Sequence, residues 1–236
     1  MTKTTKSPTI WSVPFVALMM ANFFQSIVSF AAHTTLPVYA HALGASTAMV
    51  GFVSGGFAVT ALLVRPFAGP AFDSYSRKRL YVAALGIIGM AFVVLIVVDN
   101  LVLLIVARLI QGVGIGCAGP LAISLASEYL PASKFSSGIS IFTLSQSFAQ
   151  VIGPALGLFL VDSMGFPGMC LACVSSILIA ILSLAFVKEP YREALPYVLK
   201  LDRMFAKESV IATAAILLLA ISFSCTAAYR SEEHTS

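Results

Sequence analysis

Seven apolar segments, each long enough to cross a lipid bilayer, follow one another along this chain of 236 residues. They cover residues 13–38, 47–67, 80–98, 101–125, 137–161, 167–187 and 209–229. A helix needs roughly 20 apolar residues to span the hydrocarbon core, and a helix satisfies its own backbone hydrogen bonds there. Only 10% of the residues are charged, against about 25% in a soluble domain. The sequence therefore predicts an all-α, polytopic membrane protein.

The basic residues gather on one side of these segments. Cytoplasmic loops of membrane proteins carry such an excess. We therefore expect a multi-pass protein of the cell inner (plasma) membrane with a cytoplasmic amino terminus. We attribute the net charge of +4 to loops at the lipid surface and expect no nucleic-acid partner. Twelve of the fourteen Lys and Arg residues follow the pattern: Lys3, Lys6, Arg65, Arg77, Lys78, Arg79, Lys134, Lys188, Arg192, Lys200, Arg203 and Lys207.

Because six is an even number of crossings, the chain is back on the cytoplasmic side after the sixth segment. We divide the chain into parts at this point. We expect residues 1–187 to form a six-helix bundle of two inverted three-helix repeats, a known plan among transporters. Residues 188–208 are predicted to be a cytoplasmic connection, and residues 209–229 a seventh helix that begins a second bundle. The tail 230–236 interrupts an apolar segment and reads like a translated sequencing adapter. We expect this tail to be non-native and the chain to be an amino-terminal fragment that lacks its carboxy-terminal bundle.

The four cysteines all fall within apolar segments, where cysteine usually acts as a small apolar side chain. Cys170 and Cys173 have C-x-x-C spacing, but no second pair and no histidine cluster accompanies them. We therefore expect no metal and no cofactor.

The connection between the second and third segments carries a closely spaced motif. Gly69 is followed by Asp73 four residues later and then by Arg77 and Lys78. The glycine permits close helix approach, and the carboxylate can cap a helix or meet a cation. The basic pair can bind this carboxylate or anionic lipid headgroups, so a simple role as a membrane anchor stays open.

This motif resembles the loop 2–3 signature of the major facilitator superfamily. Ser74 stands where that signature usually has a basic residue, and Ser76 where it usually has glycine. The resemblance implies that Gly69, Asp73, Arg77 and Lys78 form a conformational latch, which clamps two bundles together in one state of the transport cycle.

The fourth segment contains a cation, which is costly inside a membrane and usually faces a partner or water. Gln111 and Gly112 lie on the same helical face as Arg108. Partial extension of Arg108 towards the bilayer surface is an alternative. The string resembles the fourth-helix signature of the same superfamily, which implies that Arg108 faces a central cavity and takes part in substrate or proton coupling.

The fifth segment contains Gly153, Pro154 and Gly157, a combination that favours a helix bend. It resembles the fifth-helix antiporter signature of the superfamily. Ala149 and Leu158 depart from that signature, which usually has glycine at both positions.

Two polar stripes occur at helical spacing in the first and fifth segments. Because unpaired amides are expensive in hydrocarbon, both stripes should face protein or a water-filled path. Interhelical hydrogen bonding without ligand contact is an equally open reading, and His33 can be either a packed structural residue or a titrating group. The candidate path residues are Asn22, Gln25, His33, Gln146 and Gln150.

The resemblance covers residues 11–229 and implies a secondary transporter that moves a small-molecule substrate by alternating access. An efflux antiporter is favoured, with an uptake symporter as the alternative. No Asp or Glu lies within the first six segments, so the carboxylate for a coupling proton is expected in the missing bundle. An intramembrane enzyme or a non-transporting receptor is a weaker possibility, since the chain lacks a Gly-x-Ser-Gly or His-Glu-x-x-His motif and an acidic ring.

Overall fold

The computed structural model describes residues 9–97 and 99–188, and this part of the chain is helical without strands. The helices are α1 (Val13–Ala42), α2 (Thr47–Ser74), α3 (Arg77–Ile96), α4 (Leu101–Glu128) and α5 (Phe135–Ser183), with short 3-10 turns η1 (Ala132–Lys134) and η2 (Leu184–Phe186). Each of the five α-helices is long and apolar enough to cross a membrane. The all-α, polytopic prediction is confirmed. The predicted seventh helix and the tail lie outside the described residues.

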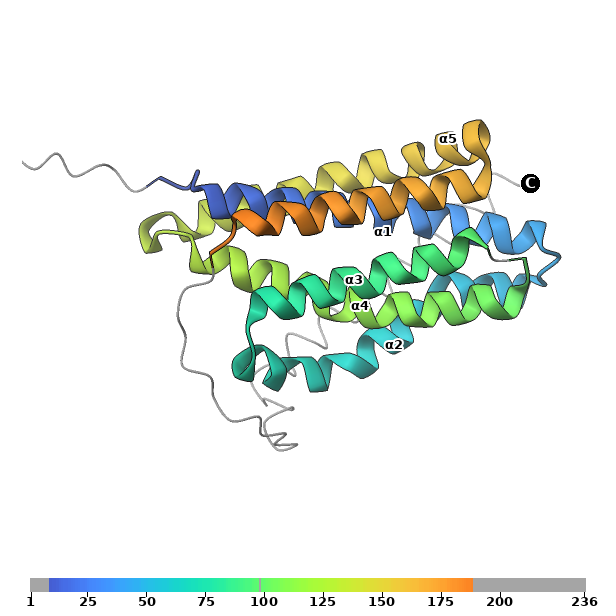
Figure 1. The fold of residues 1–236 in the computed structure, drawn as a ribbon, viewed down its shortest axis with the longest axis horizontal. Helices are drawn as coiled ribbons and strands as arrows, with labels where there is room; N and C mark the ends of the chain where they lie inside the picture. The colour runs from blue at the N-terminus through green and yellow to red at the C-terminus, as the bar shows by residue number, and fades with distance from the viewer. Residues whose placement is uncertain (1–8, 98, 189–236) are drawn as a thin grey trace, which may run out of the picture. The chain divides into compact units, whose positions relative to one another are not determined.

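The helix α5 contains two predicted membrane segments joined by a sharp reversal. Gly165 has φ 73° and ψ 174°, a backbone conformation that glycine adopts without steric penalty because it lacks a Cβ atom. Figure 1 shows the first half, yellow, and the second half, orange, running in opposite directions from this turn. Residues 162–166 were expected to connect the fifth and sixth segments. The actual connection is shorter, because helical structure continues up to Gly165.

Short polar side chains fix where four of the helices begin. A serine or asparagine just before the apolar run accepts a backbone N–H of the first turn, which would otherwise lack a partner. This cap places the start of α3 at Arg77 and not at the predicted residue 80, so the basic residues form its first turn. The caps and the donors are Ser12 with Phe15, Ser46 with Met49, Ser76 with Arg79, and Asn100 with Leu103.

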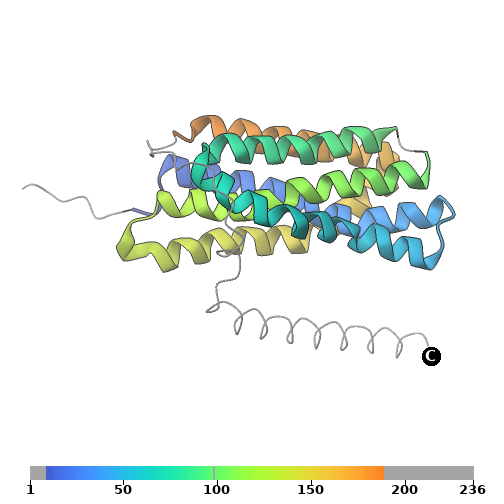
Figure 2. The same ribbon diagram turned by 90° about the horizontal axis from the view of Figure 1, so that it is seen from below.

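Glycines set the distances between the helices. Figures 1 and 2 show α1 lying between the two halves of α5. A Cβ atom on Gly153 would lie 2.8 Å from Cβ of Phe30, so α5 packs directly on the backbone of α1 there. Gly116 approaches α2 in the same manner, with Ala61 O 2.7 Å from such a Cβ, and Gly114 approaches α3. Lipid provides no hydrophobic force between helices, so close van der Waals packing at small residues stabilises the bundle.

Candidate functional site

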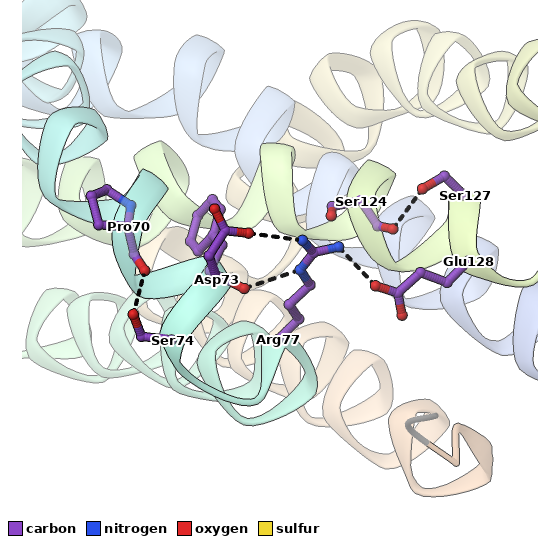
Figure 3. Close-up of polar contacts among 8 residues, drawn as sticks. Pro70, Asp73, Ser74, Arg77, Ser124, Ser127 and Glu128 are labelled. Atoms are coloured by element: carbon purple, nitrogen blue, oxygen red, sulfur yellow. Dashed lines mark hydrogen bonds and ion pairs between the residues drawn. The ribbon is translucent and has the colours of Figure 1, made fainter. Parts of the chain in front are cut away.

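The latch motif brings together the ends of three helices. Gly69 and Asp73 lie in the last turns of α2, and Arg77 is the first residue of α3. The Arg77 guanidinium donates from Nη2 to Asp73 Oδ1 at 3.2 Å, from Nη1 to Glu128 Oε1 at 2.7 Å and from Nε to the Phe72 carbonyl at 3.1 Å. Glu128 is the last residue of α4. Figure 3 shows the guanidinium between the two carboxylates.

Each of these charges lies at the helix end that disfavours it. The amino end of a helix carries a partial positive charge and the carboxyl end a partial negative one. Arg77 begins α3, whereas Asp73 and Glu128 lie at the carboxyl ends of α2 and α4. Each charge is therefore unfavourable where it stands alone, and the cluster offsets all three at once. Arg77 is the common member of this cluster, because it bonds both carboxylates.

The two ion pairs of Arg77 differ in strength. The contact with Glu128 is the shorter one. The side chains of Arg77 and Glu128 are 15% and 22% exposed, whereas the side chain of Asp73 is 51% exposed. Exposed pairs are weakened by solvent, and short charge-assisted hydrogen bonds are the strong ones. Glu128 is therefore the main partner of Arg77, although it lies 51 residues away in the sequence. One signal in the sequence could have identified it, since Glu128 is an acidic residue in the short connection that follows the fourth segment.

The two departures from the family signature have local structural roles. Ser76 caps α3 by accepting the Arg79 backbone N–H at 3.2 Å, and Ser74 donates to the Pro70 carbonyl at 2.9 Å.

The other two predicted latch residues, Lys78 and Gly69, have different surroundings. Lys78 donates from Nζ to the carbonyl of Val187 at 2.6 Å. No described atom lies within 4 Å of a Cβ built on Gly69, so within residues 9–188 this glycine faces open space.

Arg108 is buried where α4 meets α2. The residue is 1% exposed, and its guanidinium donates to the carbonyls of Val53 at 2.8 Å and Ser54 at 3.4 Å and to Gln111 Oε1 at 2.8 Å. A carbonyl has two lone pairs, so these helical carbonyls can accept a second donor. The Arg108 side chain is therefore enclosed by the protein, where backbone carbonyls of α2 and one amide surround its charge.

Phe57 connects this cation to α1. The guanidinium of Arg108 lies 5.0 Å from the centre of the Phe57 ring, within the range of a cation–π interaction. The His33 ring is 4.6 Å from the same phenyl ring, and Phe30 contacts His33 at 6.2 Å. One aromatic side chain thus joins α1, α2 and α4 around the cation.

Gly112 allows this junction to close. A Cβ atom at this position would lie 2.0 Å from Thr60 Oγ1 and 2.2 Å from the Phe57 carbonyl, both on α2. Such distances are far below van der Waals contact, so only glycine fits. The structure therefore brings the predicted trio Arg108, Gln111 and Gly112 together at a single helix contact.

The two predicted polar stripes have different surroundings. Asn22 and Gln25 on α1 are buried inside the bundle, and Gln25 accepts a hydrogen bond from the Tyr81 hydroxyl at 3.3 Å. His33 is half-buried, whereas Gln146 and Gln150 on α5 are exposed. The amide nitrogens of Asn22 and Gln111 have no hydrogen-bond partner among the described residues.

The Gly153, Pro154 and Gly157 motif lies inside the first half of α5. Gly153 and Gly157 pack against α1. Among the described residues of α5, non-helical backbone angles occur at Gly165 and not at this motif. That the motif bends the helix stays a prediction.

With this geometry established, comparison with known proteins identifies the family. The model of the Major Facilitator Superfamily matches residues 18–231. The chain belongs to this superfamily of membrane transporters and is a multi-pass membrane protein.

Several curated relatives carry names that refer to drug transport. The chain is 27% identical over 200 residues to the probable multidrug resistance protein EmrY of Escherichia coli (strain K12), covering 83% of this chain and 39% of the relative. It is 25% identical to the multidrug transporter protein MdtP of Bacillus subtilis (strain 168), covering 87% and 37%. It is 23% identical to the quinolone resistance protein NorA of Staphylococcus aureus (strain Mu50 / ATCC 700699), covering 81% and 50%. The chain thus spans half or less of the length of these relatives.

A solved structure has a similar fold. The crystal structure of the human organic anion transporter MFSD10 (TETRAN) matches with a TM-score of 0.61 and 17% identity, over 80% of this chain and 50% of that one. At this identity the likeness shows the fold alone.

Proposed function

We propose that this chain forms the amino-terminal bundle of a secondary transporter that exports small molecules by alternating access in exchange for protons. Superfamily membership and the drug-transport names of several relatives support this proposal. The observation that carries it is the pair of faces that the bundle leaves uncovered, because lipid is a poor partner for both.

The first uncovered face lies on α5. Thr143, Gln146 and Gln150 are exposed at helical spacing on its first half. Amides and hydroxyls facing hydrocarbon cost free energy unless they find partners. Thr143 bonds its own helix, to the Ile139 carbonyl at 2.8 Å, but the two amides extend further. We therefore place a second bundle, with a water-filled path between the bundles, against this face.

The second uncovered face lies on α2. Gly51, Gly55 and Gly69 have no described atom near a built Cβ position, although glycine destabilises a helix interior by about 0.5–1 kcal/mol relative to alanine. Close packing against a neighbouring helix would offset this cost, because glycine lets two helix backbones approach each other. Because the chain spans half or less of its relatives, we assign this neighbour to a second bundle. The Arg77 cluster lies at the carboxyl end of α2, close to Gly69, and can act there as the latch between bundles.

The Arg108 junction is the candidate coupling element. It places a buried positive charge where α1, α2 and α4 meet, and His33 contacts the same Phe57 ring. A charge in this position favours an anionic group of the substrate or an ionised carboxylate of the second bundle. A group whose charge state changes near Arg108 would change the packing of α4 on α2, which links proton binding to helix movement.

The basic residues support an orientation in which the amino terminus and the latch face the cytoplasm of the plasma membrane. Export then begins from the latch side. An uptake symporter of the same superfamily is the alternative, and the direction of the proton gradient separates the two.

The test uses the full-length protein that contains this chain, purified and reconstituted in liposomes. Ethidium and a fluorescent quinolone serve as probes, and a proton gradient of either sign is imposed. An antiporter accumulates a probe only when the lumen is acidic, because outward proton movement then drives the probe inward. Accumulation driven by an acidic exterior would indicate a symporter. Equal signals in protein-free liposomes would reject transport of these probes.

A further inference from the structure

The first turn of α3 holds three consecutive cations, Arg77, Lys78 and Arg79, at the end of the helix that repels positive charge. Arg77 is offset by Asp73 and Glu128, and the side chain of Arg79 extends outward and is exposed. Lys78 takes a third direction. Its ammonium group reaches the carbonyl of Val187, 109 residues away in the sequence, at 2.6 Å.

Val187 is the residue at which the sixth membrane segment ends. The 3-10 turn η2 stops at Phe186, and Val187 adopts an extended conformation with φ −90° and ψ 112°. Carbonyls at the end of a helix lack intrahelical partners and carry partial negative charge. Lys78 therefore meets a group that needs a donor, and the unfavourable ends of two helices compensate each other.

A second residue holds the next peptide. The hydroxyl of Tyr129 donates to the Lys188 carbonyl at 2.5 Å. Tyr129 directly follows Glu128, just as Lys78 directly follows Arg77. Arg77 and Glu128 thus belong to one cluster, which joins α2, α3 and α4. Lys78 and Tyr129, each the next residue along the chain, belong to a second cluster, which holds Val187 and Lys188. The Val187 side chain is fully buried, so this segment is packed as well as hydrogen-bonded.

We propose that Lys78 and Tyr129 form an exit clamp, which fixes the point where the chain leaves the six-helix bundle. In this assignment Lys78 acts in the exit clamp, and the ion-pair latch consists of Asp73, Arg77 and Glu128. The clamp fixes the direction in which the connection to the second bundle starts, so that a movement of α3 relative to α4 is passed to that connection.

The test measures how often Val187 becomes exposed. In the 236-residue chain, with all four cysteines replaced by alanine, Val187→Cys is the reporter in lipid nanodiscs, where both faces are accessible. The rate of alkylation by a charged maleimide reports opening of the packed segment. Four variants are compared on this background: Lys78→Met and Tyr129→Phe in the exit clamp, Arg77→Gln in the latch, and Arg79→Met as the matched control, which removes an equal charge one residue further along the same turn.

We expect Lys78→Met and Tyr129→Phe each to raise the alkylation rate by about fivefold or more, because each removes a hydrogen bond that holds the segment Val187–Lys188. Arg79→Met and Arg77→Gln should leave the rate unchanged. Unchanged rates in both clamp variants would overturn the proposal, and so would an equal increase in Arg77→Gln, which would assign the protection to the latch. If Lys78→Met does not fold, Tyr129→Phe decides alone, since it removes a single oxygen and keeps the ring. The readout does not depend on transport.

Discussion

The stability of the Arg77 cluster should depend more on Glu128 than on Asp73. The change Glu128→Gln keeps the shape of the side chain and removes its charge. The hydrogen bond between Arg77 Nη1 and Glu128 Oε1 is 2.7 Å long, and its side chains are 15% and 22% exposed. Bonds to charged groups contribute about 1.5–3 kcal/mol, and the value falls towards about 1–2 kcal/mol here because both side chains retain some contact with solvent.

Two effects reduce the expected loss. Glutamine still offers a carbonyl oxygen to Arg77, and removal of the carboxylate relieves its repulsion from the carboxyl end of α4, which is about 0.3–1 kcal/mol. We therefore expect Glu128→Gln to lower the free energy of unfolding by about 1 kcal/mol. For Asp73→Asn, at 3.2 Å and with a side chain 51% exposed, we expect less than about 0.5 kcal/mol.

The assay is reversible unfolding of the chain in mixed micelles titrated with sodium dodecyl sulfate, followed by circular dichroism. A double-mutant cycle with Arg77→Gln isolates the pair energy, which should be about 1 kcal/mol for Glu128 and smaller for Asp73. Asp162→Asn is the control, because it removes an exposed acidic charge that has no ion pair within residues 9–97 and 99–188. A larger coupling energy for Asp73 than for Glu128 would refute the ranking by distance and exposure.

Three further results are expected. Gly112→Ala should lower the free energy of unfolding by about 1–3 kcal/mol in the same titration, because its Cβ would overlap Thr60 and the α2 backbone. Gly119→Ala should cost nothing, because no neighbouring helix in the described part of the chain comes within 4 Å of a Cβ at that position; equal losses would refute close packing at Gly112. Arg108→Lys in the full-length protein should abolish probe flux in liposomes but leave membrane insertion intact, because the three donors of an ammonium group start from one nitrogen and do not reproduce the planar fork in which Nε, Nη1 and Nη2 each reach a different acceptor; retained flux would contradict the coupling role. Lys134→Cys should react with an impermeant maleimide in inverted membrane vesicles but not in intact cells, and the opposite pattern would reverse the proposed orientation.

Much of the fold follows from local sequence. The lengths of the apolar runs set which segments cross the membrane, and the serine or asparagine before a run sets where several helices start. Gly165 sits inside the predicted connection 162–166, and the reversal between the two halves of α5 occurs there. These features depend on nearby residues and on the solvent, so they can be predicted without knowledge of neighbouring helices.

The sequence also identified the polar positions without their partners. The family signature singled out Arg77 and Lys78, but the partners Glu128 and Val187 lie 51 and 109 residues away. That Arg108 faces a central cavity stays a prediction, and the structure adds that its guanidinium donates to backbone carbonyls of α2. Backbone carbonyls have no sequence signature, because every residue carries one.

The two polar stripes show the same division. Helical spacing placed each stripe on one face of its own helix, and their composition was similar. Packing then buried Asn22 and Gln25 inside the bundle and left Gln146 and Gln150 exposed on α5. Periodicity determines a face relative to the helix axis, and only the order in which helices pack determines what lies opposite that face. The sequence thus determined the membrane segments and the candidate residues, and the tertiary structure decided their partners.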